Sequence, residues 1–262
     1  MASHANAAYA QEHGFFDEEI VPVKTKVLDK DGNEKEIVVS KDEGIRRGTN
    51  MKILGKLRPA FKKGGSTTAG NSSQVSDGAA AVVLARRSFA EKHGLPIVAR
   101  LVSSAIAGVP PHIMGIGPAY SIPLALQKCG LKMNDIDIVE LNEAFASQAT
   151  YCANKLGIER KRLNPKGGAI ALGHPLGMTG ARMVGTLLSE LKRTQKKYGI
   201  VSMCIGTGMG AAAVFEREDG SQGASYQAYR SVNPQTNTLN KSFPFDTKEQ
   251  LVSKINRSYA AY

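Results

Sequence analysis

The feature of this sequence that most constrains its fold is a regular alternation of short apolar runs and amphipathic stretches between residues 97 and 216. Apolar runs bounded by turn residues predict buried strands, whereas apolar residues spaced three and four positions apart predict helices. Such an alternation is typical of α/β layer structures, and here it ends in two adjacent strands. The predicted strands are Ile97–Ser103, Ile136–Leu141, Ala169–Leu172, Ile200–Cys204 and Ala211–Phe215, and the predicted helices are Tyr120–Lys128, Glu143–Leu156 and Thr179–Arg193.

The residues before this region are less regular. Residues 1–13 are rich in alanine and predict a helix that begins without a capping residue. Two β-prone runs within residues 20–39 flank Asp-Gly and Gly-Asn and predict a hairpin or an extended excursion. Residues 40–66 predict a polar, basic surface loop, and the apolar run Ala79–Leu84 predicts a further buried strand. After a linker-like stretch, residues 226–262 are polar, with one short helix predicted from Thr247.

Composition excludes several classes of protein. The 262 residues are 42% hydrophobic and 22% charged, which excludes a collagen-like, coiled-coil or wholly disordered chain. The sequence contains no apolar run of about 18 residues, and its first residues lack a signal-peptide pattern, so we expect no membrane span. The three cysteines, Cys129, Cys152 and Cys204, are too few and too scattered for a disulfide framework or a zinc site. We therefore expect a reducing compartment and no metal.

The net charge of +11 favours anionic partners: nucleic acid, an anionic membrane surface or a phosphate-bearing small molecule. The cations are spread along the chain, and the densest clusters are pairs such as Arg46–Arg47 and Lys62–Lys63. There is no tryptophan and only 6% of the residues are aromatic, so no platform for base stacking is visible. These observations disfavour nucleic acid as the partner.

Three polar side chains follow predicted strands, where ligands gather in open α/β sheets. They are Asn142, His174 and Cys204. Each has an ordinary structural explanation: the asparagine as a helix N-cap, the histidine as a partner of a backbone carbonyl, and the cysteine as a small buried hydrophobe. Their joint occurrence beside glycines, whose amides can approach a ligand closely, predicts an active-site wall.

The glycines of the segment Gly206–Gly210 do not fit a dinucleotide site. That motif requires a strand, a turn and a helix with an acidic residue about twenty positions further on. Here the glycines lead into the apolar run Ala211–Phe215. We therefore expect a tight turn between paired strands, with its amides facing the Cys204 end.

Three segments carry a specific resemblance: NEAFASQ (142–148), NPKGGAIALGHPLGMTGAR (164–182) and CIGTGMGAAAVFE (204–216). They resemble the C-terminal signatures of the thiolases. Two further stretches, KLRPAFKKGGSTTAGNSSQVSDGAAAVVLARRS (56–88) and VPPHIMGIGPAY (109–120), most resemble the peroxisomal 3-ketoacyl-CoA thiolases. The resemblance covers residues 1–218 in order, and it implies thiolytic cleavage of 3-oxoacyl-CoA by CoA in fatty acid β-oxidation.

The resemblance also implies roles for single residues. Cys204 matches the cysteine that acts as acid and base, and His174 matches the histidine that activates the nucleophilic cysteine and donates to the thioester oxygen. Asn142 matches the residue that holds a water in that oxyanion site, and the Gly206 amide matches part of the other oxyanion hole. Thioester chemistry needs a thiolate, a base and fixed donors where negative charge develops.

For substrate binding, the resemblance implies that coenzyme A is bound as a substrate, with no permanently bound cofactor and no metal. Arg46 would face the adenine and phosphate end, Ala69 and Ser73 would line the pantetheine tunnel, and Met114 and Phe145 would shape the acyl pocket. A solvated loop charge remains the alternative for Arg46. The resemblance implies a homodimer and a peroxisomal location, with a mitochondrial or cytosolic one as the alternative.

The sequence departs from the family in two ways. It contains no Cys-x-Ser-Gly segment of the kind that holds the acylated nucleophile, so we expect this chain alone to be inactive; the alternative is a non-catalytic fragment that binds CoA or a thiolase subunit. Residues 229–262 resemble the opening of a succinate-semialdehyde-type aldehyde dehydrogenase. The expected fold is α/β, a thiolase-like layered fold with a complete C-terminal repeat and an incomplete N-terminal repeat and loop domain. The expected divisions are 1–66 (loop domain), 67–94 (end of the N-terminal repeat), 95–218 (C-terminal domain) and 219–262 (linker and tail).

Overall fold

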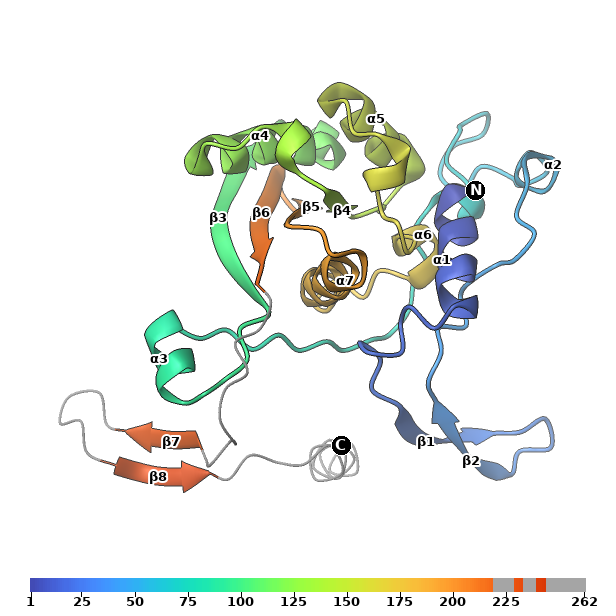
Figure 1. The fold of residues 1–262 in the computed structure, drawn as a ribbon. Coiled ribbons are helices and arrows are strands. Elements are labelled where there is room, and N and C mark those ends of the chain that lie inside the picture. The colour runs from blue at the N-terminus through green and yellow to red at the C-terminus, as the bar shows by residue number, and fades with distance from the viewer. Residues whose placement is uncertain (219–228, 233–238, 244–262) are drawn as a thin grey trace. The chain divides into compact units, whose positions relative to one another are not determined.

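The computed structural model describes residues 1–218, 229–232 and 239–243 (Figure 1). The chain falls into two compact units. The first comprises Met1–Glu19, Asp42–Val83 and Val98–Asp219, and the second comprises Ile20–Lys41, Leu84–Ile97 and Gly220–Tyr262. The candidate site lies in the first unit.

The first unit is built on a four-stranded mixed sheet in the order β3-β6-β5-β4. β4 and β5 are parallel, whereas β3 and β5 both run antiparallel to β6. The four strands confirm four of the five strands predicted for the 97–216 region. Their bounds are β3, Ala99–Gly108; β4, Ile138–Leu141; β5, Tyr198–Ile205; and β6, Met209–Arg217.

Helices cover both faces of this sheet (Figure 1). α4 (Pro118–Cys129) and α5 (Ala146–Leu156) lie on one face, and α7 (Thr179–Thr194) lies on the other. These helices confirm the three predicted ones. The core under α4 and α5 is the larger, whereas Leu187 and Leu191 of α7 pack on Ile138 and Phe215. Apolar side chains on alternate faces of the strands supply both layers.

Strand β4 shows how this alternation places polar groups. Val139 and Leu141 belong to the core under α4 and α5, whereas Ile138 belongs to the core under α7. Side chains two positions apart in a strand share a face, so Glu140 and Asn142 continue the α7 face. Both are buried, with 1% of each residue's surface exposed. The strand therefore delivers two polar side chains into the layer between the sheet and α7.

The remaining elements of the first unit are short or lie in the N-terminal part. α1 (Ala2–Glu12) confirms the predicted first helix, which begins without a side-chain cap. α2 (Met51–Leu54) lies in the predicted surface loop. α6 (Ala169–Leu172) precedes His174, and four 3₁₀ turns span Ala69–Asn71, Pro111–Ile116, Met133–Asp135 and Arg160–Arg162.

The second unit contains the predicted hairpin, in which β1 (Val23–Leu28) pairs antiparallel with β2 (Glu34–Val39). It also contains α3 (Arg87–Lys92) and the antiparallel pair β7 (Tyr229–Val232) and β8 (Leu239–Phe243), which the sequence did not predict. The helix predicted from Thr247 lies outside the described residues. Among the described residues, no helix is both long and apolar enough to cross a membrane.

Two predicted strands are wrong. Ala169–Leu172 forms α6, with the Ala171 and Leu172 amides donating to the Gly168 carbonyl. Four apolar residues carry too little periodicity to separate a buried strand from a helical turn, because both bury the same side chains. Ala79–Leu84 forms no strand, and Val83 and Leu84 are 90% and 75% exposed. A strand needs a hydrogen-bonded neighbour, and no strand in the described residues pairs with this run.

Candidate active site

His174 lies between two polar side chains of different elements. Its Nε2 is 3.1 Å from Asn142 Nδ2 at the end of β4, and its Nδ1 is 2.6 Å from Thr179 Oγ1 at the start of α7. Thr179 Oγ1 donates its one hydrogen to the Pro175 carbonyl, at 2.9 Å. The threonine oxygen must then accept from the imidazole, so His174 Nδ1 carries the proton.

This arrangement leaves the lone pair of His174 on Nε2, where the Asn142 amide donates to it. Burial, with a smaller contribution from the positive charge of Arg182, lowers the pKa of His174 below its usual 6.5. The imidazole is therefore neutral at pH 7 and able to accept a proton at Nε2. Asn142 Oδ1 is buried and has no hydrogen-bond partner among the described residues, which leaves an acceptor available beside the same nitrogen.

The loop that carries His174 is fixed by Gln74. The Gln74 side-chain Nε2 lies 2.8 to 3.1 Å from the carbonyl oxygens of Gly44, Ile170 and Ala171, and the Gln74 backbone carbonyl accepts from the His174 amide at 3.0 Å. Gly173 adopts φ +88°, and a Cβ there would lie 2.0 Å from Ser76 Oγ. The turn into His174 therefore requires glycine.

Cys204 lies at the same edge of the sheet as Asn142. The Asn142 amide donates to the Ser202 carbonyl at 2.9 Å, which places Cys204 two residues further along the neighbouring strand β5. Burial raises the pKa of the Cys204 thiol, whose own backbone amide opposes this more weakly. The thiol is therefore protonated at neutral pH and suited to donate a proton. Cys152 in α5, with its pKa raised to about 11 by burial, is less reactive still.

The segment Gly206–Gly210 forms the predicted turn between paired strands, since β5 and β6 are antiparallel on either side of it. Two of its glycines serve packing, not ligand approach. A Cβ on Gly208 would lie 2.4 Å from the Val109 carbonyl oxygen, and one on Gly210 would lie 2.1 Å from the backbone of Gly117. Gly206 has nothing within 4 Å of such a position and is exposed, so its surroundings remain open to a ligand.

The structure brings two of the predicted substrate-binding residues together. The Ser73 amide donates to the Ala144 carbonyl at 2.9 Å, and Ser72 forms a β-bridge with Phe145. Phe145 is 37% exposed. Ala69 lies in the short 3₁₀ turn Ala69–Asn71, close in sequence to this bridge. The segment from Ala69 to Ser73 therefore lies against the start of α5.

Met114 lies in the 3₁₀ turn Pro111–Ile116, which packs against α5. The neighbouring Gly115 carbonyl accepts from Gln148 Nε2 at 3.2 Å. Gln148 in turn accepts from the Phe145 amide at 3.4 Å. Met114 and Phe145 thus belong to two segments that Gln148 connects.

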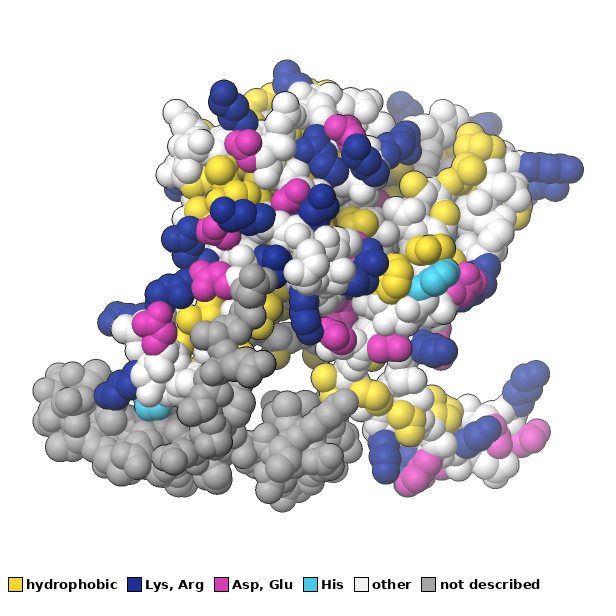
Figure 2. Space-filling model, in the orientation of Figure 1, with side chains coloured by type: hydrophobic (Ala, Val, Ile, Leu, Met, Phe, Trp, Pro, Cys, Tyr) yellow, Lys and Arg dark blue, Asp and Glu magenta, His cyan; other side chains and the backbone are white. Residues whose placement is uncertain are grey.

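Arg46 lies in a different part of the first unit. It lines a cavity of about 270 Å³ between α1 and the loop before α2, together with His4, Glu12, Arg47 and Thr49. The Arg46 amide donates to His4 Nδ1 at 3.1 Å, and the Arg47 guanidinium contacts the Glu12 carboxylate. Lys and Arg side chains are spread over the face of the molecule shown in Figure 2, interspersed with Asp and Glu. The positive charge is therefore not gathered at Arg46 alone.

Sequence reasoning missed four residues that shape this site: Gln74, Glu140, Thr179 and Arg182. Thr179 is the first residue of a predicted helix and lies five residues after His174. Its position in the sequence could therefore have indicated a contact with His174. Glu140 is a charged residue inside a predicted buried strand, which also marks it as exceptional. Gln74 contacts residues up to 97 positions away in the sequence, so no local sequence pattern indicates these contacts. Within the described ranges, no group of three or more His, Cys, Asp or Glu side chains could hold a metal ion.

A neutral histidine, a protonated cysteine and an exposed glycine therefore lie toward one edge of an α/β sheet. The family models for the thiolase N-terminal domain and the thiolase C-terminal domain match residues 1–88 and 95–217. The chain belongs to the thiolase family.

Among curated proteins it is similar to the peroxisomal 3-ketoacyl-CoA thiolase A of Mus musculus, with 69% identity over 217 residues, 82% of this chain and 51% of that protein. It is also 66% identical to the peroxisomal 3-ketoacyl-CoA thiolase of Homo sapiens, with the same coverage of both chains. The chain spans about half the length of the curated relatives it matches.

Solved thiolase structures share the fold. The dimeric peroxisomal thiolase of Saccharomyces cerevisiae matches with a TM-score of 0.74 and 53% identity, covering 82% of this chain and 52% of that one. Human mitochondrial 3-ketoacyl-CoA thiolase in complex with CoA matches with a TM-score of 0.74 and 38% identity, over the same shares of the two chains.

Proposed function

We propose that this chain supplies the acid/base and oxyanion-binding part of a thiolase that cleaves 3-oxoacyl-CoA with CoA to acetyl-CoA and a shortened acyl-CoA. The observation that carries the proposal is the contact of His174 with Asn142 and Thr179. It holds a neutral imidazole with its proton-accepting nitrogen beside Asn142, which follows β4, and Cys204 lies near the end of the neighbouring strand β5.

In the proposed reaction, His174 Nε2 takes the proton of a nucleophilic thiol, and the resulting thiolate attacks the 3-keto carbon. The bond between C2 and C3 then breaks, and the Cys204 thiol protonates C2 to release acetyl-CoA. The Cys204 thiolate next takes the proton of the incoming CoA thiol, and the CoA sulfur attacks the acyl-enzyme. The bond between the acyl carbon and the enzyme sulfur breaks, the shortened acyl-CoA leaves, and the freed enzyme thiolate takes back the proton held by His174. The Gly206 amide and the His174–Asn142 pair face the two oxyanions.

The proposed reaction also needs a nucleophilic cysteine that becomes acylated. None of the cysteines in this sequence lies in a Cys-x-Ser-Gly segment. Cys129 is bonded within α4 to the Ala125 and Leu126 carbonyls, and Cys152 is buried. We therefore propose that the nucleophile comes from thiolase residues outside these 262, and that this chain does not turn over substrate alone.

Coenzyme A is the proposed substrate of this site, with Arg46 at the cavity beside α1 facing its phosphates. Ala69 and Ser73 are the proposed pantetheine contacts, and Met114 and Phe145 are the proposed acyl contacts. We further propose a peroxisomal location and dimeric assembly, as the names of the relatives indicate for those proteins. The proposed domains are residues 1–66, 67–94, 95–218 and 219–262, as expected from the sequence.

The test is to incubate the purified chain with a 3-oxoacyl-CoA and CoA, alone and together with a thiolase N-terminal half that carries the Cys-x-Ser-Gly segment. We expect turnover only in the mixture, and we expect His174→Asn and Cys204→Ser each to abolish it. Cys129→Ser, a matched change at a cysteine of α4, should leave the rate unaltered. Turnover by the chain alone, or activity insensitive to both variants, would refute the assignment.

A non-catalytic role makes a different prediction for the same materials. Calorimetric titration with CoA would then give binding, and a full-length thiolase would capture the chain, but the mixture would show no turnover. This outcome would replace the catalytic proposal with the binding one.

A further inference from the structure

We propose that Asn164, together with Glu143, is a positioning residue that holds Asn142 against His174. Asn164 fixes the end of β4, which carries Asn142, and Glu143 joins that strand end to α6, which precedes His174. The inference rests on the proposed function in one respect, namely that the Asn142–His174 pair belongs to the catalytic site. The experiment below observes the contact of this pair directly and does not depend on turnover.

The side chain of Asn164 pairs with the backbone of β4 as a neighbouring strand would. The Leu141 amide donates to Asn164 Oδ1 at 2.8 Å, and Asn164 Nδ2 donates to the Leu141 carbonyl at 2.9 Å. Two residues that exchange both hydrogen bonds are typical of an antiparallel ladder. The Asn164 backbone amide adds a third bond, to the Val139 carbonyl at 2.9 Å. Asn164 therefore takes the place of a strand along this edge of β4.

The end of β4 is held on both sides by this arrangement. The backbone groups of successive residues in a strand point to opposite sides, and the Asn142 amide accordingly donates to Ser202 of β5 at 2.9 Å. None of Leu141, Asn142 and Asn164 is more than 3% exposed. Without the Asn164 side chain, the amide and carbonyl of Leu141 would be buried and unpaired. The strand end that carries Asn142 would then have to move to find other partners.

The second hydrogen of Asn164 Nδ2 reaches the residue on the other side of Asn142. Asn164 Nδ2 donates to Glu143 Oε1 at 3.1 Å. Glu143 Oε2 accepts from the amide of Ile170 in α6 at 3.4 Å. The Glu143 carboxylate therefore connects the residue after Asn142 to the helix that precedes His174.

The contacts of Asn164 specify asparagine at this position. Its φ of +44° lies in the left-handed region, which asparagine, aspartate and glycine adopt more readily than other residues. Of these three, only asparagine offers both an acceptor for the Leu141 amide and two donors, for the Leu141 carbonyl and for Glu143. The left-handed backbone alone would be met equally well by glycine.

The contact that these residues hold tolerates little movement. Asn142 Nδ2 lies 3.1 Å from His174 Nε2. A distance of about 3.6 Å is no longer a hydrogen bond, so a relative displacement of about 0.5 Å between the strand end and the His174 loop would break the contact. Small misplacements of catalytic groups cost up to about 100-fold in rate. The bonds on both sides of Asn142 therefore bear directly on the proposed chemistry.

The test is an NMR measurement on the full chain with ¹⁵N-labelled histidine, at about pH 8, where the His174 imidazole is neutral. The protein has five histidines, and His174→Gln identifies the signal of interest. Asn142→Ala removes the donor and gives the His174 Nε2 resonance without its hydrogen bond. Asn164→Asp keeps the left-handed backbone and the acceptor but loses both donors, so we expect it to move the Nε2 resonance at least half of the way to that value. Asn164→Gly, which adds no charge, should move it as far.

Glu143→Gln tests the second link. Alone, it replaces one carboxylate oxygen by an NH₂ group, so one of the bonds to Asn164 and Ile170 is lost. We expect a smaller shift of His174 Nε2 in the same direction. Combined with Asn164→Asp, the amide introduced at position 143 can donate to the carboxylate introduced at position 164, and the shift should be smaller than in Asn164→Asp alone. A double variant that shifts by the sum of the single variants would contradict the link through Glu143.

The matched control is Ser103→Ala. Ser103 Oγ donates to the Ala125 carbonyl at 2.7 Å, so this variant also removes a side-chain bond to the backbone, but between β3 and α4. We expect a lower urea midpoint and an unchanged His174 Nε2 resonance. An unchanged resonance in both Asn164 variants, or an equal shift in Ser103→Ala, would overturn the proposal. If far-UV circular dichroism shows that neither Asn164 variant folds, the absence of a shift in Glu143→Gln would overturn it.

Turnover separates this proposal from the proposed function. In the mixture with a thiolase N-terminal half, we expect Asn164→Asp to lower kcat by about 10- to 100-fold and to leave KM for CoA within about threefold. An unaltered kcat in a variant whose His174 Nε2 resonance has shifted would overturn the positioning role. An inactive unsubstituted mixture would instead refute the proposed function, while the NMR measurement would still decide whether Asn164 holds Asn142 against His174.

Discussion

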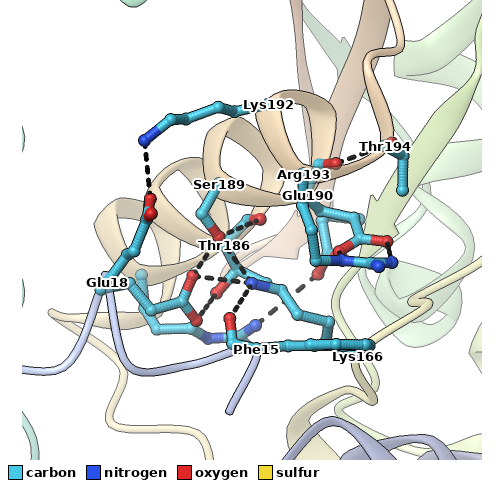
Figure 3. A network of polar contacts seen from close by, with 12 residues as sticks. Phe15, Glu18, Lys166, Thr186, Ser189, Glu190, Lys192, Arg193 and Thr194 are labelled. Atoms are coloured by element: carbon cyan, nitrogen blue, oxygen red, sulfur yellow. Dashed lines mark hydrogen bonds and ion pairs between the residues drawn. The ribbon is translucent and has the colours of Figure 1, made fainter. Parts of the chain in front are cut away.

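Lys166 offers a sharp test of how the first unit is held together, because it is a lysine with only 1% of its side chain exposed. Its Nζ donates to the Phe15 carbonyl at 3.1 Å, to Glu19 Oε2 at 2.9 Å and to Ser189 Oγ at 2.5 Å (Figure 3). Glu19 also accepts from Thr186 Oγ1, at 3.0 Å. The ammonium thus joins the segment after α1 to the middle of α7.

Lys166→Met keeps most of the side-chain volume and removes the charge, so the loss of packing is small. Glu19, whose side chain is 15% exposed, then keeps a buried negative charge without its cation. Breaking a buried ion pair in this way costs about 3 to 5 kcal/mol of unfolding free energy. Combining it with Glu19→Gln removes both charges, and we expect the double variant to recover about 2 kcal/mol or more of the summed loss.

The assay is urea unfolding followed by far-UV circular dichroism, since the protein has no tryptophan. The control is Lys192→Met in α7, which breaks the ion pair of Lys192 with Glu18, the residue before Glu19. Both of those side chains are largely exposed, so we expect less than about 1 kcal/mol. A loss below about 1 kcal/mol for Lys166→Met, or additivity in the double variant, would refute the reasoning.

Three further predictions follow from the site. Thr179→Val removes the acceptor of His174 Nδ1, so we expect a loss of about 1 to 2 kcal/mol and a changed tautomer, read from imidazole ¹⁵N shifts. Because burial raises the pKa of Cys204, its alkylation by iodoacetamide should be slow at pH 7 and should keep accelerating above pH 9, as measured by peptide mass spectrometry. Gly210→Ala would place a Cβ 2.1 Å from the Gly117 backbone, so we expect a loss of about 2 kcal/mol or more in urea unfolding. A stable Gly210→Ala protein, rapid alkylation at pH 7, or an unchanged Thr179→Val tautomer would each contradict the corresponding contact.

The sequence predicted most of the layered part of the fold, because those elements have strong periodicity. The stripe of Met183, Leu187 and Leu191 in α7 is an example, and all three side chains are buried. The prediction is wrong at Ala169–Leu172, because so short an apolar run fits a buried strand and a helical turn equally well. It also failed at Ala79–Leu84, where strand formation depends on a partner that composition does not reveal.

The same division holds for the candidate site. Asn142, His174 and Cys204 are identified because they follow predicted strands. In the structure Asn142 follows β4 and Cys204 lies near the end of β5, whereas His174 follows the helix α6. The structure nevertheless joins Asn142 and His174 directly and sets Cys204 at the same edge of the sheet. The residues that surround these side chains were missed, since Gln74 and Arg182 contact residues far from them in the sequence. Strand ends mark where chemistry can occur, but the state of each group depends on packing between elements.

α7 contributes residues to several of these contacts. Its apolar stripe packs on the sheet, its first residue fixes the tautomer of His174, and the charge of Arg182, three residues later, adds to the effect of burial in lowering the pKa of His174. Two turns further on, Ser189 joins the buried network of Lys166, which in turn acts on Glu140. A shift of this helix would change the orientation, the tautomer and the proton affinity of His174 together. The buried charges along α7 are therefore best understood as fixing the position of one helix on which the proposed base depends.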